Sequence, residues 1–225
     1  STSNAIINDY IFMCFLLGND FVPHSPTLSI RSGGIKRLIE HYVHVFNKTK
    51  AHLVTITTDE KTGKIKTKIN LKPFTMLIGL LANEEDHQMF SLYRKRERLS
   101  YRPIQNRNPK GTALDDEFHK LHYKPSFDIE TELKLKIDGN FGWKQKYFNH
   151  VLRMKRTEQN IDDVCENYLI GLDWVLQYYY TETHSWGWIY KYLSSPLFQD
   201  LYLYLSKNKF TEFPTEPEET KRMTP

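Results

Sequence analysis

The sequence predicts a mainly α protein, an irregular helical domain with one small β-hairpin. Apolar residues recur at helical spacing in several long segments. One stretch, LVTITTDEKTGKIKTKIN at 53–70, instead alternates polar and apolar residues on both sides of a turn that contains Gly63. With 225 residues and 14% aromatic content, the chain is long enough to bury a sizeable core and too aromatic to be a disordered protein.

Two helices are predicted before the hairpin and one after it. Residues 4–17, NAIINDYIFMCFLL, form a helix with Asn4 as its N-cap, a buried apolar second half and an end at Gly18. The spacing predicts a second helix over 33–46 and a long third helix over 71–99, with a proline near its first turn and basic residues at its C-terminal end. The apolar positions of the second helix are Ile35, Leu38, Ile39, Tyr42, Val43 and Phe46.

The second half of the chain contains the clearest helical pattern, NIDDVCENYLIGLDWVLQYYY at 160–180, with two aspartates expected in its first turn. Residues 99–142 have little periodicity and are predicted to be an irregular connection with one short helix. We therefore expect one helical domain over 1–206, built from segments 1–98, 99–142 and 143–206, and a polar, proline-rich tail over 207–225.

Composition limits the compartment and the partners. The net charge of +4 is a mild basic bias, which suits a nucleic-acid partner without establishing one. Cys14 and Cys165 both lie in apolar helical runs, so we expect buried free thiols in a reducing compartment. Neither a span of about 20 apolar residues nor a basic signal-peptide start is present. We expect a soluble intracellular protein and favour the cytoplasm over the nucleus.

The stretch FLLGNDFVPHSPTL at 15–28 brings a carboxylate, Asp20, to the C-terminal end of a buried helix. The helix dipole makes this placement unfavourable by about 0.3–1 kcal/mol unless something offsets it. A bound cation would do so, and so would an ion pair with Arg31 or Lys36. Alternatively, the Asp20 side chain accepts hydrogen bonds from backbone N–H groups of the turn, which is ordinary Gly-Asn-Asp chemistry.

Two blocks of sequence resemble the 5′→3′ exoribonucleases of the XRN type. The first is NDYIFMCFLLGNDFVPHSPTLSIRSGGIKRLIEHY at 8–42, where an apolar helix leads into Gly-Asn-Asp-Phe and then Pro-His. The second is CENYLIGLDWVLQYYYTETHSWGWIYKY at 165–192. The blocks occur in the order of the family, and the resemblance covers roughly 1–205 with a weak middle.

The resemblance implies that Asp20 is a catalytic metal ligand, one of several carboxylates that hold Mg²⁺ or Mn²⁺. Asp9 lies eleven residues earlier on the same helix, about 16 Å away and too far to share a metal. The family's other carboxylates, and its pocket for the 5′ phosphate, lie in an N-terminal nuclease core that this chain is expected to lack. Joined to that core, the chain would take part in RNA degradation as a 5′→3′ exoribonuclease, a hydrolase of single-stranded RNA with a 5′ monophosphate, and alone it would be inactive.

The resemblance also implies substrate-binding residues. A tryptophan from this region of the family stacks on RNA bases, and we favour Trp186 over Trp188, although both could equally be core residues. Arg31 is assigned to substrate binding or to holding the Asp20 turn. The sequence departs from the family at 191–196, KYLSSP, where the family has a Pro-Tyr-His-Tyr-Ala-Pro run.

Weaker signals remain. The cluster YRKRER at 93–98 is either a solvated helix end or a phosphate contact. The pairs His41/His44 and His119/His122 have spacing that could bind zinc, but no cysteine lies nearby, so we expect no zinc site.

The alternative function is a non-catalytic RNA- or protein-binding module that retains the fold without the active site. A flap-endonuclease relative acting on DNA is disfavoured because those enzymes lack the second block.

Overall fold

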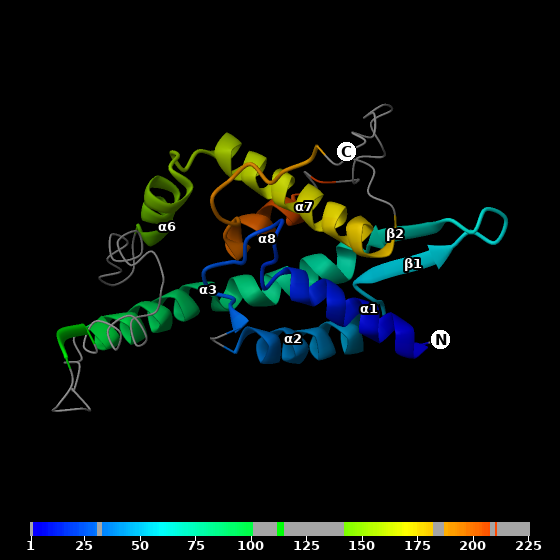
Figure 1. Cartoon of the computed structure of the whole chain (residues 1–225), viewed down its shortest axis with the longest axis horizontal. Helices are drawn as coiled ribbons and strands as arrows, with labels where there is room; N and C mark the ends of the chain where they lie inside the picture. The colour runs from blue at the N-terminus through cyan, green and yellow to red at the C-terminus, as the bar shows by residue number, and fades with distance from the viewer. Residues whose placement is uncertain are drawn as a thin grey trace. The chain divides into compact units, whose positions relative to one another are not determined.

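The structure is a computed structural model that describes residues 2–30, 33–100, 112–114, 142–181, 187–207 and 210. It confirms the mainly α class with one two-stranded antiparallel hairpin (Figure 1). The chain divides into two compact units, one formed by Ser1–Asp86 with Thr157–Pro225 and the other by His87–Arg156. The long helix α3, Leu71–Ser100, passes from the first unit into the second.

Helix α1 spans Thr2–Phe15 and carries the apolar run into the core. The apolar side chains Phe12, Met13 and Phe15 of its second half are buried as predicted, with Phe12 fully shielded from solvent. The predicted N-cap is wrong, because the helix begins at Thr2 and Asn4 lies inside its first turn. After Phe15 a tight turn continues to Gly18, whose N–H donates to the carbonyl of Phe15 at 3.1 Å.

Helix α2, Gly34–Thr49, has a narrower buried face than the predicted stripe. Leu38, Tyr42 and Val45 are buried, whereas Ile39 and Val43 are 41% and 51% exposed. Spacings of three and four residues keep the buried side chains above one another on one face of the helix. The two exposed residues lie one position further along the chain than Leu38 and Tyr42, which turns them away from the core.

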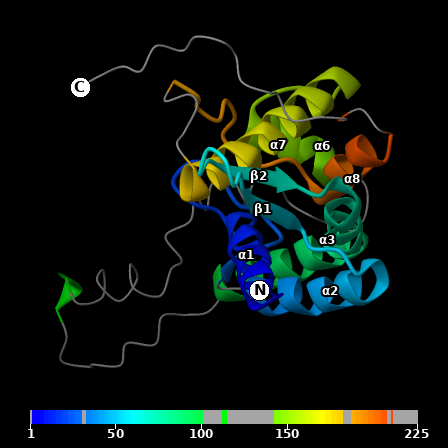
Figure 2. The same cartoon turned by 90° about the vertical axis from the view of Figure 1, so that its right-hand side faces the viewer.

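Strands β1, Val54–Thr58, and β2, Ile65–Ile69, form the predicted hairpin. The register pairs Val54 with Ile69 and Thr58 with Ile65. Only the pair at the open end of the hairpin is buried, with Val54 at 3% and Ile69 at 1% exposure. The hairpin lies between α1 and the long helix α7, with β1 on the α1 side and β2 on the α7 side (Figure 2).

Helix α7, Glu158–Tyr180, is the predicted central helix, and it begins earlier than expected. The side-chain oxygen of Thr157 accepts from the N–H of Asn160 at 3.2 Å and fixes the start. Asp162 and Asp163 are therefore in the second turn, and Glu158 occupies the first-turn position that we had assigned to them. The predicted helix itself is confirmed.

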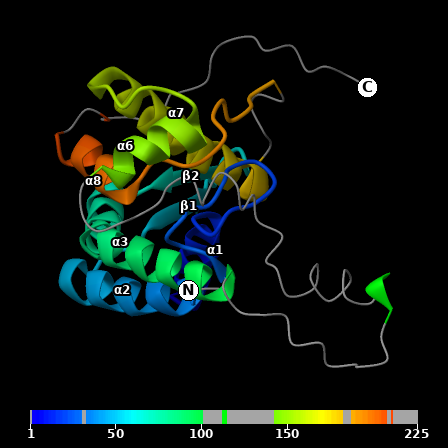
Figure 3. The same cartoon turned by 90° about the vertical axis from the view of Figure 1, so that its left-hand side faces the viewer.

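Helix α8, Phe198–Ser206, was not predicted. Its start is capped by another helix, because the buried Glu85 of α3 accepts from the N–H groups of Phe198 at 2.6 Å and Gln199 at 2.9 Å. Gly79 of α3 allows the close approach, since a Cβ there would lie 2.8 Å from the ring of Tyr202. Helices α2 and α8 lie on opposite sides of the first half of α3 (Figure 3).

The second unit contains the end of α3, helix α6 at Trp143–Tyr147 and one turn of π-helix, η2, at Phe148–Leu152. The predicted irregular connection falls almost entirely outside the described residues. Of the predicted tail, the structure describes Lys207 and Phe210, and Phe210 is buried at 6% exposure. The predicted domain boundaries therefore stay predictions.

Candidate active site at the Asp20 turn

The backbone at the end of α1 is fixed by Asn19 rather than by Asp20. The Asn19 side-chain oxygen accepts from the N–H groups of Phe21 at 2.9 Å and Val22 at 3.0 Å. The Asn19 N–H in turn donates to the carbonyl of Val22 at 3.0 Å. One alternative from the sequence was that the Asp20 side chain accepts hydrogen bonds from backbone N–H groups of the turn. The structure gives this role to the neighbouring Asn19.

Gly18 is required at the start of this turn for two reasons. Its φ of +88° lies in the left-handed region that L side chains rarely adopt. A Cβ at this position would also lie 3.0 Å from the backbone nitrogen of His24 and 3.1 Å from its Cβ. The turn therefore folds back closely on the Pro-His segment, and the His24 ring is held by its Nδ1, which donates to the Ser25 carbonyl at 2.7 Å.

The turn leaves the Asp20 carboxylate exposed to solvent. Among the residues that the structure describes, none forms a hydrogen bond or ion pair with it. Lys36, one of its two predicted ion-pair partners, is instead 3.9 Å from Glu40 on α2. The other partner, Arg31, lies outside the described residues. Within the described part of the chain, both carboxylate oxygens of Asp20 therefore remain available to bind a cation.

Phe21, the residue after Asp20, packs against a row of stacked aromatic rings, here called the aromatic ladder: Tyr178, Trp174 and Trp188. The Trp174 ring lies parallel to Tyr178, with centroids 5.6 Å apart and planes 10° apart, and stacks on Trp188 at 5.4 Å and 26°. Phe21 contacts Trp174 and Tyr178 with its centroid 4.9 Å from each. Phe21 follows Asp20 in the chain, so the turn that carries the Asp20 carboxylate also supplies a ring that packs against the ladder.

Gly171 on α7, which has no side chain, makes room for the ladder. A Cβ on Gly171 would lie 2.7 Å from the Trp188 ring and 2.8 Å from a methyl carbon of Val22. Trp188 therefore packs over Gly171 and is partly buried, while Tyr178 at the other end is 39% exposed. Trp186, the tryptophan that we favoured, lies outside the described residues.

Sequence analysis missed Phe21, Trp174 and Tyr178 as site residues. The signal was present, because Trp174 and Tyr178 are four residues apart and so share a helix face. What the sequence did not show is that Phe21 and Trp188, from two distant loops, pack against that face.

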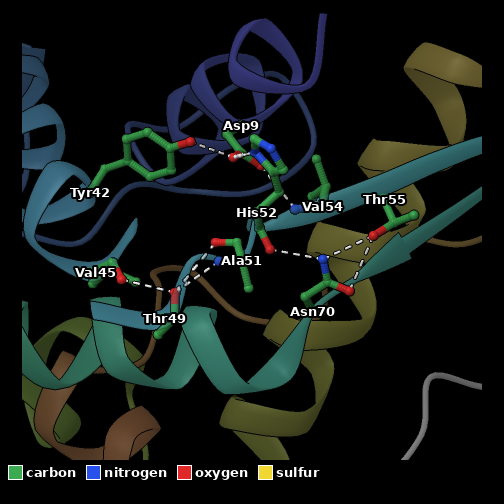
Figure 4. Close-up of polar contacts among 9 residues, drawn as sticks. All are labelled: Asp9, Tyr42, Val45, Thr49, Ala51, His52, Val54, Thr55 and Asn70. Atoms are coloured by element: carbon green, nitrogen blue, oxygen red, sulfur yellow. Dashed lines mark hydrogen bonds and ion pairs between the residues drawn. The ribbon is translucent and has the colours of Figure 1, made fainter. Parts of the chain in front are cut away.

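Asp9 is a structural residue (Figure 4). Its side chain is fully buried, and one carboxylate oxygen accepts from the Tyr42 hydroxyl and from His52 Nδ1, each at 2.6 Å. The other oxygen accepts from the N–H of Val54 at 3.0 Å. Burial and the neighbouring carboxylate raise the pKa of Tyr42 well above its usual value, so the phenol remains a donor. The network ties α1 and α2 to the start of β1.

A second polar cluster holds the loop that follows the Asp20 turn. Arg37 Nη2 donates to the carbonyl of Thr27 at 3.1 Å, and Arg37 Nε lies 3.8 Å from Glu84 of α3. His41 Nε2 also contacts Glu84, at 3.1 Å. Burial lowers the pKa of the Arg37 guanidinium, and the Glu84 carboxylate opposes that shift. These contacts anchor the loop to α2 and α3.

The remaining predicted candidates belong to the other unit or fall outside the described residues. Of the basic cluster at 93–98, the structure describes the side chains of Tyr93, Arg94 and Lys95, which belong to the other unit. Arg94 lies over the Phe90 ring, 4.6 Å from its centroid. His119 and His122 lie outside the described residues. In the described part of the chain, no three histidine, cysteine or acidic side chains gather as a metal site would require.

The sequence matches the Xrn1 helical domain family over residues 2–131 and 117–217. The chain therefore belongs to this family, which confirms the resemblance seen in its two sequence blocks. It is 26% identical to 5′-3′ exoribonuclease 2 of Gallus gallus over 86% of its length, and 28% identical to a Drosophila melanogaster homologue of that protein over the same share. It is also 26% identical to 5′-3′ exoribonuclease 1 of Homo sapiens over 88% of its length.

The chain spans only part of these relatives. It covers 26% of the Gallus gallus protein, 24% of the Drosophila melanogaster protein and 13% of the Homo sapiens protein. Within the described residues, no helix has the length and hydropathy needed to cross a bilayer.

Proposed function

We propose that this chain is the helical part of a 5′→3′ exoribonuclease, in which Asp20 supplies one carboxylate to a catalytic metal site and the aromatic ladder stacks RNA bases. The observation that carries the proposal is an exposed carboxylate, unpaired within the described residues, on a turn whose next residue, Phe21, packs against stacked aromatic rings. The names of the relatives support the reaction class.

The donor chemistry of Asp20 fits Mg²⁺ or Mn²⁺, which prefer carboxylate oxygens, but one carboxylate does not complete a site. The remaining ligands would come from an N-terminal nuclease core in the same or another chain. Such a metal, when bound, stabilises charge on the scissile phosphate and activates water. The part of this chain is to hold Asp20 in place through the Gly18–Asn19 turn.

Exposed apolar side chains on α1 and α7 support the proposal that a further protein segment, the nuclease core, packs against this chain. On α1, Ile6, Ile7 and Tyr10 are 46%, 54% and 43% exposed, and on α7 Tyr179 is 57% exposed. The Tyr179 ring stacks on Phe15 of α1 at 5.2 Å, so two helices that pack together, α1 and α7, both contribute exposed apolar surface. Covering it would remove apolar surface from water, a favourable change. We assign this surface to contact with the nuclease core.

The function is tested with the chain joined to its nuclease core, using single-stranded RNA with a 5′ monophosphate. We expect mononucleotides to be released from the 5′ end, activity to stop when EDTA removes the metal, and activity to return with Mg²⁺ or Mn²⁺. RNA of the same sequence with a 5′ hydroxyl should be degraded much more slowly. Metal-independent cleavage, or endonucleolytic products, would rule out the proposed reaction.

The ladder is tested at its exposed end. Replacing Tyr178 with Ala should weaken binding of single-stranded RNA at least about fivefold, because stacking contributes about 1–3 kcal/mol per base. Tyr178→Phe keeps the ring and should bind as the unaltered chain does. Fluorescence anisotropy with a labelled oligouridylate measures both, and Trp188→Ala should reproduce the loss. Equal affinities of the Ala and Phe variants would show that bases do not stack there.

A further inference from the structure

One face of the hairpin carries lysine and threonine side chains and no acidic side chain. The register pairs Thr55 with Lys68 and Thr57 with Lys66, and side chains alternate along each strand, so these four residues share a face. All four are exposed. We call them the hairpin face.

The hairpin is anchored through its opposite side, which leaves the hairpin face open. Val54 and Ile69, a cross-strand pair of that opposite side, are buried in the core formed with α1 and α7. Figure 1 shows the turn of the hairpin extending beyond the neighbouring ends of those two helices. The hairpin face is therefore accessible to a partner along the full length of the two strands.

The positive charge of this surface is offset only in part within the described residues, where Lys66 interacts electrostatically with the Asp59 carboxylate. Neither Lys66 nor Lys68 forms an ion pair there, and Lys61 and Lys64 add two exposed ammonium groups at the turn. Asp59 accepts from the N–H groups of Lys61 at 2.9 Å and of Thr62 at 3.0 Å, which directs its carboxylate toward the turn backbone. Four lysines against Asp59 and Glu60 give residues 55–68 a formal charge of +2.

We propose that the hairpin face contacts the phosphate backbone of single-stranded RNA. Lys66 and Lys68 are two residues apart on one strand, about 6.8 Å along its axis. This resembles the separation of successive phosphates in an extended single strand. Ammonium and hydroxyl groups donate to phosphate oxygens without reading bases, so the contact is independent of sequence. The inference rests on the proposed function, since it takes RNA as the substrate class.

The placement of the hairpin agrees with this role. The C-terminal end of α7, which carries Tyr178, lies beside β2 (Figure 1). The hairpin and Tyr178 belong to the same compact unit. An RNA strand that stacks on Tyr178, the exposed end of the aromatic ladder, could therefore continue onto the hairpin face. A competing explanation is that lysines on an edge strand prevent pairing with other chains, which would require no ligand.

The experiment compares two double variants of equal charge change. K66Q/K68Q removes the lysines of the hairpin face, and K36Q/K48Q removes two exposed lysines of α2. Binding of a labelled oligouridylate is measured by anisotropy over a series of KCl concentrations. We expect K66Q/K68Q to bind about tenfold or more weakly at low salt and to flatten the slope of log affinity against log salt by about 1.4, or 0.7 per lost phosphate contact. K66R/K68R should bind normally.

Several outcomes would overturn the contact: equal losses in the two double variants, an unchanged salt slope, or no RNA binding by the unaltered chain at low salt. Self-association of K66Q/K68Q in light scattering with unchanged RNA affinity would instead establish the edge-protection explanation. Tighter binding to phosphatidylserine vesicles than to RNA would replace RNA by a membrane. A hairpin effect together with full hydrolysis by an Asp20 variant would remove the proposed catalytic function and leave the hairpin contact in place.

Discussion

Replacing Asp20 with Asn should lower the turnover of the assembled nuclease about 1,000-fold or more. The variant keeps the size of the side chain and removes the charge that would hold the metal. A catalytic metal contributes several kcal/mol of transition-state stabilisation, and each 1.4 kcal/mol corresponds to a factor of ten in rate. Single-turnover hydrolysis of RNA with a 5′ monophosphate measures this loss.

Two further measurements separate a catalytic role of Asp20 from a structural one. Because Asn19 closes the turn and Asp20 is exposed, Asp20→Asn should change the free energy of unfolding by less than about 0.5 kcal/mol. RNA affinity in metal-free buffer should also be unchanged. Glu40→Gln removes an exposed carboxylate of α2 and should retain full turnover. Normal turnover by Asp20→Asn would favour the alternative of a non-catalytic binding module.

Replacing Asp9 with Ala should lower the free energy of unfolding by about 3–5 kcal/mol, the usual cost of removing one partner from a buried charged network. The fully buried carboxylate accepts three hydrogen bonds, and its removal leaves the Tyr42 hydroxyl, His52 Nδ1 and the Val54 N–H without an acceptor. Urea denaturation followed by circular dichroism measures the change.

Tyr42→Phe is the milder companion variant. It removes one of the three donors to Asp9 and keeps the ring, so the loss should be about 1–2 kcal/mol. The two effects should not add, because both variants disrupt the same network. Should Asp9→Ala unfold at the same urea concentration as the unaltered chain, the network would not be a determinant of stability.

Asp9 and Asp20 show how far sequence alone predicts this site. The sequence places both carboxylates on or after the first helix, and their separation along the chain predicts that they do not share a metal. The sequence could not distinguish a buried carboxylate with three donors from an exposed one with none among the described residues. That distinction depends on Tyr42, His52 and Val54, which lie 33, 43 and 45 residues away from Asp9 in the chain.

The ends and faces of helices show the same limit. The existence of α7 follows from its periodic apolar residues, yet its start at Glu158 depends on a hydrogen bond that the Thr157 side chain accepts from the Asn160 N–H. Helix α8 begins where Glu85 of α3 accepts its first N–H groups, so a residue more than a hundred positions away fixes its start. Local pattern therefore predicts that a helix exists better than where it begins.

By itself the sequence determined the mainly α class, the hairpin, the long helices and the family, because hydrophobic periodicity and short motifs are local properties of the chain. Only the tertiary structure decided that Asn19 closes the turn, that Asp9 is enclosed, and that Phe21, Trp174, Tyr178 and Trp188 come together. The physical reason is that burial and ring stacking depend on which distant segments share a surface, and packing of the whole core sets that arrangement.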